Sequence, residues 1–261
     1  RKLMKRLNVS RRDCVVVADD RNNLPMFPMC RVRIGFNPDF LVAARADVVV
    51  RRALLDVAPI ILEEGAGPSL RPPSRREVIR ESIHIGSILV PVLCMHLVEC
   101  RILTALILLV AVGYFVSEVA RMRGRGIPPF SWVTRRAAIG VEICEPAVSP
   151  LLFAAGMILA LSVFPLPERY AAAAVLSLGD GVAALSGACL GRTVLPINKG
   201  KHLEGTILGF LASLLGALIF VDPVKALVAA AAGMAAESLP LPINDNITIP
   251  VFSGLAMMAV P

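Results

Sequence analysis

The most informative part of the sequence is Leu178-Gly-Asp-Gly-Val-Ala-Ala-Leu-Ser-Gly-Ala-Cys-Leu-Gly-Arg192, which Asn198-Lys-Gly-Lys-His-Leu-Glu-Gly-Thr206 follows closely. It predicts an apolar helix that carries one carboxylate, Asp180. The small residues after this acid, at positions 183, 184, 187 and 191, lie near one face of such a helix. That face allows another chemical group to approach the backbone closely.

The stretch has two interpretations. Gly187 and Gly191 are spaced as in the small-residue seams between packed membrane helices. The charged residues favour a second interpretation, because helix packing requires neither an internal acid nor a basic loop. Together they are the inventory needed to hold a polyphosphate and a divalent metal ion. These residues are Asp180, Arg192, Lys199, Lys201 and Glu204.

The composition indicates a membrane protein. Of 261 residues, 56% are hydrophobic and only 18% are charged, and the mean hydropathy is +0.71, which is too apolar for an ordinary soluble domain. The net charge of +7 does not indicate nucleic acid, since basic and aromatic residues are not interleaved. The six cysteines form no CxxC pair, so we expect reduced thiols. The chain starts at Arg1 without a signal peptide, and we expect it to be the C-terminal part of a longer protein.

Residues 1–62 read as a soluble α/β segment. Strands are expected at 14–18, 32–35 and 46–50, with a helix near 40–45. The first strand delivers Asp19 and Asp20 at its carboxyl end, where open α/β sheets place their ligands. Residues 63–77, rich in glycine, proline and charge, form a linker to residues 78–261.

This segment carries a first resemblance. The stretches Val17-Ala-Asp-Asp-Arg-Asn-Asn-Leu-Pro-Met-Phe27, Ile34-Gly-Phe-Asn37 and Ala46-Asp-Val-Val49 resemble the last third of haloacid-dehalogenase-type phosphatases such as phosphoserine phosphatase. The resemblance implies that Asp19 is a candidate magnesium ligand, while Asn23 replaces the second acid of the pattern. The family's nucleophilic Asp pair is missing. Either the missing half precedes this chain in the native protein, or the domain has become a regulatory or structural module.

After the linker, apolar runs long enough to cross a bilayer follow one another. They lie near 81–98, 101–119, 147–165, 170–190, 204–221, 223–238 and 247–261, and the last two are short. Lys and Arg gather before the first run, after the second and after the fourth, which predicts that these loops and the N-terminal segment are cytoplasmic. The expected fold is therefore a polytopic α-helical membrane protein of about seven spans, preceded by a partial Rossmann-like segment.

Ionisable residues gather at the cytoplasmic ends of these spans. Each alone reads as a snorkelling or capping residue, but together they favour a shared polar pocket. Gly179 and Gly181 flank Asp180 and would loosen the helix, exposing backbone donors to phosphate. The residues concerned are Arg80, His84, Glu118, Arg121, Asp180, Arg192, Lys199, Lys201, Glu204, Glu237 and Asp245.

The stretch between Glu237 and Pro250 is also informative. Its prolines stop a helix, and Asn244-Asp245-Asn246 presents oxygen ligands just before the final span. The alternative is an Asx-rich turn that only caps that span, since Asp and Asn are good N-caps.

These motifs carry a second resemblance. They are Gly179-Asp180 with the small residues up to Gly191, Lys201-xx-Glu204-Gly205, Glu237 with Asp245-Asn246, and Arg80-Glu-Ser-Ile-His84. In this order they resemble the dolichol and polyprenol kinase family, which is related to the phosphatidate cytidylyltransferases. One departure is His202, where the family usually has Ser. The resemblance covers about residues 78–261 and implies phosphoryl transfer from CTP to a long lipid alcohol at the cytoplasmic membrane face.

The resemblance implies roles for the residues singled out above. The candidate catalytic acids are Asp180, Glu204, Asp245 and Glu237, and the first three are candidate Mg²⁺ ligands. Asp245 or Glu237 would orient the lipid hydroxyl or accept its proton. The positions expected to bind the nucleotide are Gly179, Gly181, Gly187, Gly191, Arg192, Lys199, Lys201, Gly205 and Asn246. Arg80, His84, Glu118 and Arg121 complete the expected polar face.

Two other functions stay open. A CTP-dependent cytidylyltransferase that makes a CDP-lipid would use similar residues, with the arginines at 121, 123 and 125 binding the acceptor phosphate. A transporter or non-catalytic scaffold would use the polar face as a substrate path, although the two halves of the span set show no inverted repeat.

Overall fold

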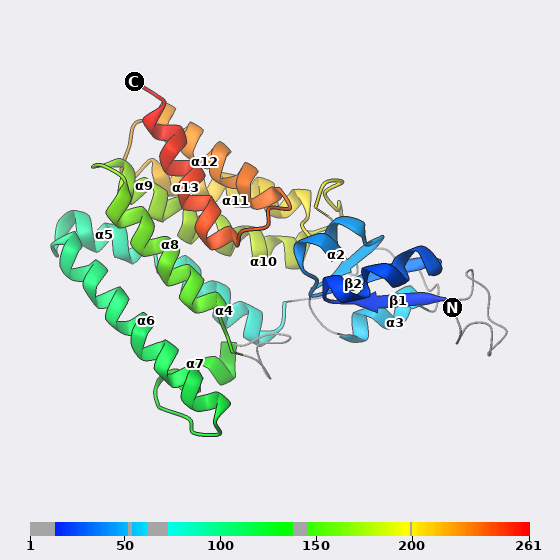
Figure 1. The fold of residues 1–261 in the computed structure, drawn as a ribbon. Coiled ribbons are helices and arrows are strands. Elements are labelled where there is room, and N and C mark those ends of the chain that lie inside the picture. The colour runs from blue at the N-terminus through cyan, green and yellow to red at the C-terminus, as the bar shows by residue number, and fades with distance from the viewer. Residues whose placement is uncertain (1–13, 52–53, 62–72, 138–145, 199) are drawn as a thin grey trace.

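The computed structural model describes residues 14–51, 54–61, 73–137, 146–198 and 200–261, which form a small α/β segment and a larger helical bundle (Figure 1). The predicted phosphate ligand Lys199, most of the predicted linker and the first 13 residues lie outside the described part of the chain.

The α/β segment is built on three short parallel strands. These are β1 (Val15–Ala18), β2 (Val32–Phe36) and β3 (Val48–Val50), in the order β1-β2-β3. Between them lie η2 (Arg21–Met29) and α2 (Phe40–Arg45), and η3 (Leu54–Val57) and α3 (Ala58–Ile61) follow. Asp39 caps α2 by accepting a hydrogen bond from the Val42 N–H at 2.8 Å. The strands and the helix that the sequence predicts for this segment are confirmed.

The bundle contains helices at all seven predicted positions. They are α4 (Arg75–Gly86) with α5 (Leu89–His96), α6 (Cys100–Met122), α8 (Ser149–Val163), the continuous helix α9 (Glu168–Ala174), η5 (Val175–Asp180) and α10 (Gly181–Leu190), α11 (Leu203–Ala217), α12 (Pro223–Ser238) and α13 (Asp245–Met258). A short helix, α7 (Phe130–Ala137), follows α6. Among the described residues, three helices are long and apolar enough to cross a membrane: Arg75–His96, Cys100–Met122 and Glu168–Leu190.

The helix Glu168–Leu190 is the centre of the bundle. Its residues from Ala171 to Leu176 are fully buried, with α8, α11, α12 and α13 packed around them. Helix α6, in contrast, exposes large apolar side chains such as Leu109 and Phe115 along its length. An exposed apolar face of this extent is what a lipid-facing helix requires, because lipid, unlike water, solvates it without cost.

Glycines set how closely the central helix approaches its neighbours. A Cβ added to Gly205 would lie 2.7 Å from the Ala183 carbonyl oxygen, and one added to Gly209 would lie 2.8 Å from the Gly179 carbonyl oxygen. Gly205 also packs directly on Gly187. These contacts favour the interpretation of the glycines as a small-residue seam between helices.

A matched pair of glycine substitutions tests this packing. Gly156 on α8 faces the Asn246 carbonyl oxygen with no room for a Cβ, whereas a Cβ on Gly86 would have no neighbour within 4 Å. Gly156→Ala should therefore lower the free energy of unfolding by about 1–3 kcal/mol or more. Gly86→Ala should leave it unchanged or raise it by up to about 1 kcal/mol, because Gly is a poor helix former. Thermal or denaturant unfolding of the purified protein in detergent measures both, and equal stability of the two variants would contradict the packing described here.

Candidate functional site

The first cluster of buried ionisable residues joins the first helix of the bundle to the central helix. Ser74 starts α4 with a capping box, in which its hydroxyl accepts from the Glu77 N–H and Glu77 accepts from the Ser74 N–H. The helix then places Glu81 and His84, three residues apart, on the face that meets Asp180. His84 Nδ1 lies 3.1 Å from Asp180 Oδ2 and 3.8 Å from Glu81 Oε2.

Both helices depart from regular α geometry next to this cluster. The first helix is interrupted after Gly86, and the central helix widens into a π-helical turn, η5, that ends at Asp180. The Ser87 hydroxyl donates to the Ser177 hydroxyl at 2.7 Å, which connects the two irregular segments. The sequence predicts a helix loosened at Asp180, and the observed form is a continuous helix with a π turn. Such turns are frequent at functional sites.

The His84 ring has a fixed position. It stacks on Phe153 of α8, with ring centroids 4.1 Å apart. On the central helix, a Cβ at Gly181 would lie 3.3 Å from the His84 Cβ and 2.7 Å from Ile85. Gly181 therefore lets α4 approach closely enough for His84 to reach Asp180.

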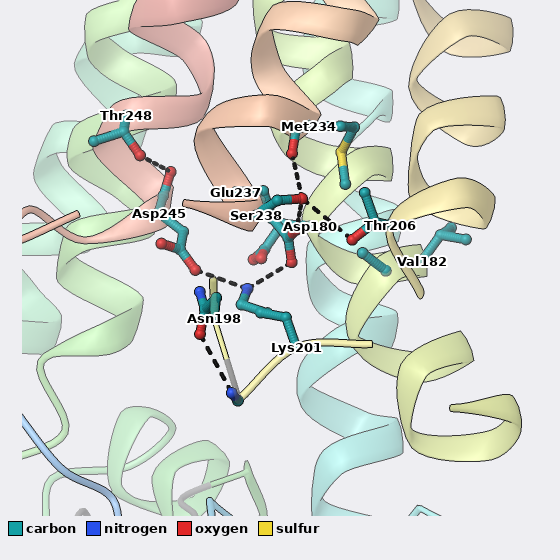
Figure 2. A network of polar contacts seen from close by, with 12 residues as sticks. Asp180, Val182, Asn198, Lys201, Thr206, Met234, Glu237, Ser238, Asp245 and Thr248 are labelled. Atoms are coloured by element: carbon teal, nitrogen blue, oxygen red, sulfur yellow. Dashed lines mark hydrogen bonds and ion pairs between the residues drawn. The ribbon is translucent and has the colours of Figure 1, made fainter. Parts of the chain in front are cut away.

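The second cluster surrounds Lys201 (Figure 2). The loop before α11 turns back on itself through an isolated bridge between Val194 and His202, so that Lys201 points into the bundle. Its Nζ donates to Glu237 Oε1 at 2.6 Å and to Asp245 Oδ2 at 2.8 Å. Glu237 lies in the last turn of α12 and its side chain is 2% exposed, while Asp245 begins α13 and its side chain is 33% exposed.

The two clusters share one electrostatic environment. Burial alone would lower the pKa of the Lys201 ammonium, but the negative charges of Asp245, Glu237 and, in addition, Asp180 raise that pKa well above its usual value. Lys201 is therefore a permanent cation between the carboxylates of α12 and α13 and that of the central helix. The structure thus brings together Asp180, Lys201, Glu237, Asp245 and His84 of the predicted site.

Other predicted site residues have different surroundings. Glu204, in the first turn of α11, accepts from the Thr193 N–H with both carboxylate oxygens, at 3.0 and 3.2 Å, and so fixes the end of the loop. Arg192 is exposed, and the Gly191 backbone is covered by His202. Asn246 is buried, and its Oδ1 has no hydrogen-bond partner among the described residues. The predicted alternative of an Asx cap is also present, since Asn244 caps α13 by accepting from the Asn246 N–H.

Glu118 and Arg121 form a separate network. The Arg121 guanidinium donates to both Glu118 oxygens, at 2.8 to 3.1 Å, and the Thr134 hydroxyl and the Ala147 N–H donate to the same carboxylate. This carboxylate therefore connects α6, α7 and the segment before α8. These hydrogen bonds satisfy the buried Glu118 carboxylate, so a structural role is enough to explain why this acid is buried.

The acidic loop of the α/β segment is held by local bonds. The Asp19 carboxylate accepts from the Asp20 N–H at 2.9 Å, and the Asn23 side-chain amide donates to Asp20 Oδ1 at 3.1 Å. Asp19 thus lies at the carboxyl end of β1, as the sequence predicts, with its side chain engaged in the loop.

Glu81 belongs to the first cluster but is not among the predicted site residues, although Arg80 and His84 of the same motif are. Arg80 Nε lies 3.6 Å from Glu81 Oε1. An acid three residues before a histidine on an apolar helix is the signal that would have identified it, since this spacing places both on one face.

Comparison with known proteins adds no identification: the chain matches no protein-family model, no curated protein and no solved structure. By its structure the protein is mostly helical, and the described residues include three helices suited to crossing a membrane and a small parallel sheet.

The Lys201 cluster yields a stability prediction. Lys201→Met removes the cation and leaves Glu237 as a buried, uncompensated charge, so the free energy of unfolding should fall by about 3–5 kcal/mol. Adding Glu237→Gln to this variant should recover part of the loss, because the second substitution removes the orphaned charge. Arg101→Met is the matched control, since the Arg101 side chain is 93% exposed and should contribute almost nothing. Unfolding in detergent measures all three, and wild-type stability of Lys201→Met would contradict the cluster.

Proposed function

We propose that this chain is a CTP-dependent kinase of a polyprenol- or dolichol-type lipid alcohol, and that the seven helical regions of its bundle cross the membrane. The observation that carries the proposal is the convergence of Asp180, Lys201, Glu237 and Asp245, from four separate segments, at one polar site within an apolar bundle. Charges at such depth are costly, and they usually mark a site of ion or substrate chemistry.

Phosphoryl transfer suits this combination of charges. The reaction depends on positioning and on stabilising negative charge on the transferred group, rather than on covalent chemistry by the protein. Lys201 is the partly buried cation of the site, and Arg192 is exposed on the same loop, where a nucleotide arriving from the aqueous side would meet it first. We propose that both bind the phosphates of CTP.

The two acids around Lys201 have different exposure, which assigns them different roles. Asp245 is one-third exposed and therefore accessible to a substrate hydroxyl, so we propose that it orients the lipid alcohol and accepts its proton. Glu237 is almost fully buried and keeps Lys201 in place. The lipid would enter between helices at the level of the membrane interface.

The donor set also fits Mg²⁺, which hard carboxylate oxygens bind. Asp180 would hold the ion that accompanies the nucleotide, while Asp245 serves the lipid hydroxyl and Glu204 accepts a hydrogen bond from the Thr193 N–H with both oxygens. When bound, Mg²⁺ neutralises charge on the phosphates.

The predicted sidedness and the N-terminal resemblance belong to the same proposal. The Lys201 loop would lie on the cytoplasmic side together with the α/β segment, as the distribution of basic residues predicts. We propose that the α/β segment is the C-terminal portion of a haloacid-dehalogenase-like domain, and Asp19 stays its candidate magnesium ligand.

A labelling experiment tests the reaction type. Purified protein in detergent receives Mg²⁺, a mixture of lipid alcohols and lipid phosphates, and CTP labelled at either the γ- or the α-phosphate. We expect label in the lipid fraction from the γ-position. Label from the α-position would instead identify a CDP-lipid synthase, and no transfer from either position would favour a transporter or scaffold.

Asp180→Asn tests the central acid with little change in shape. Loss of its charge should lower the rate of γ-phosphate transfer about 100-fold or more. The matched control is Asp222→Asn, because Asp222 only caps α12 by accepting from the Val224 and Lys225 N–H groups, and Asn caps almost equally well. Transfer rates are compared at equal amounts of folded protein. Full activity of Asp180→Asn would overturn the assignment.

A further inference from the structure

The cluster of Glu81, His84 and Asp180 has the composition of a metal site. One imidazole nitrogen and two carboxylate oxygens from these residues all lie within 4.8 Å of one another. Metal–ligand bonds of about 2.0–2.2 Å place neighbouring ligand atoms roughly 3 Å apart. The observed separations of 3.1 Å between His84 and Asp180 and 3.8 Å between His84 and Glu81 approach this value.

The three side chains of the cluster are largely buried, so water solvates their charges poorly. The side chains of His84, Glu81 and Asp180 are only 6%, 10% and 15% exposed. The helix break and the π turn lie beside them, and the stacked Phe153 ring fixes the imidazole plane. A site that is rigid before the ion arrives avoids the cost of ordering its ligands on binding.

The local balance of charge is an independent reason to expect a cation. In the two clusters the described residues include four carboxylates, those of Glu81, Asp180, Glu237 and Asp245. The cations in contact with them are Lys201, which both Glu237 and Asp245 hold, and Arg80, beside Glu81. Among the described residues, the carboxylates of the two clusters therefore outnumber the cations that contact them by two. A bound divalent cation would let the buried carboxylates carry their charge at a lower cost.

We propose that Glu81, His84 and Asp180 bind one divalent transition-metal ion, of the Mn²⁺ or Zn²⁺ class, without nucleotide or lipid. The imidazole ligand selects this class over Mg²⁺, which prefers oxygen ligands only. The site differs from the predicted set of Asp180, Glu204 and Asp245, because the protein supplies all three ligands from the first helix and the central helix. It does not rest on the proposed kinase reaction.

Metal binding is measured on the whole chain, purified in detergent and stripped with a chelator. Mn²⁺ is titrated in the absence of nucleotide while electron paramagnetic resonance follows the free ion, and Zn²⁺ is measured by competition. Wild type should bind one Mn²⁺ per chain. His84→Gln, Glu81→Gln and Asp180→Asn should each weaken binding about 10-fold or more. His96→Gln is the matched control, since His96 is exposed at the end of the same predicted span and should have no effect.

A spectroscopic measurement on wild type keeps the proposal testable if a variant does not fold. Bound Mn²⁺ should show the ¹⁴N coupling of one imidazole in pulsed electron paramagnetic resonance, and His96→Gln should retain that coupling. The proposal is overturned by the absence of stoichiometric binding, by a lack of nitrogen coupling, or by folded His84→Gln that binds Mn²⁺ as wild type does. A failed kinase assay would leave these readouts unchanged, so the two proposals fail separately.

Discussion

The structure depends on keeping charged groups inside an apolar helical bundle. Asp180 lies on the central helix, three positions after a run of fully buried residues that ends at Ser177. A carboxylate in such surroundings must be hydrogen-bonded or paired, because its desolvation is otherwise too costly. His84 meets this requirement directly, and the ammonium group of Lys201 adds a favourable charge interaction at longer range, so α4 and the loop before α11 both lie near the central helix.

The partners of Asp180 can reach it only if the neighbouring helices pack closely against the central helix. Gly181 lets α4 bring His84 to Asp180, and Gly205 and Gly209 bring α11 against the same helix. The small residues and the acid, which the sequence offers as competing interpretations, are thus parts of one arrangement. The glycines bring backbones together, and the ionisable side chains meet where the helices are closest. A larger residue in the seam would separate the charges as well as the helices.

Local patterns in the sequence were sufficient for the elements of the fold. The β-branched runs predicted the strands, and apolar runs predicted seven helical regions, because both signals depend on neighbouring residues only. The break after Gly86 has no such local signal, and the glycines that flank Asp180 indicate a loosened helix but not its π-helical form. Among the described residues, only three helices are long and apolar enough to span a membrane by themselves, and the other predicted spans stay predictions.

The candidate site was predictable where one residue was unusual in its own surroundings. Asp180 is a lone acid in an apolar run, and Lys201 and Asp245 lie in or next to the loops between predicted spans. Their partners depend on tertiary packing. Glu81 meets an acid 99 positions later in the chain, and Glu204 turns to its own loop through the Thr193 N–H instead of toward the other acids. Spacing along the sequence does not determine which of several acids faces a common point.

The loop that carries Lys201 is held both by bonds within itself and by a contact from the α/β segment. The bridge between Val194 and His202 closes it, and Glu204 anchors its end. From the α/β segment, Arg51 reaches the same loop, and its guanidinium lies so close to Gly200 that a Cβ there would be 2.6 Å from Nε. Arg51 directly follows β3, at the carboxyl end of the parallel sheet. The α/β segment therefore contacts the loop directly before Lys201, the cation that Glu237 and Asp245 share, so the small sheet lies next to the site that the helices build.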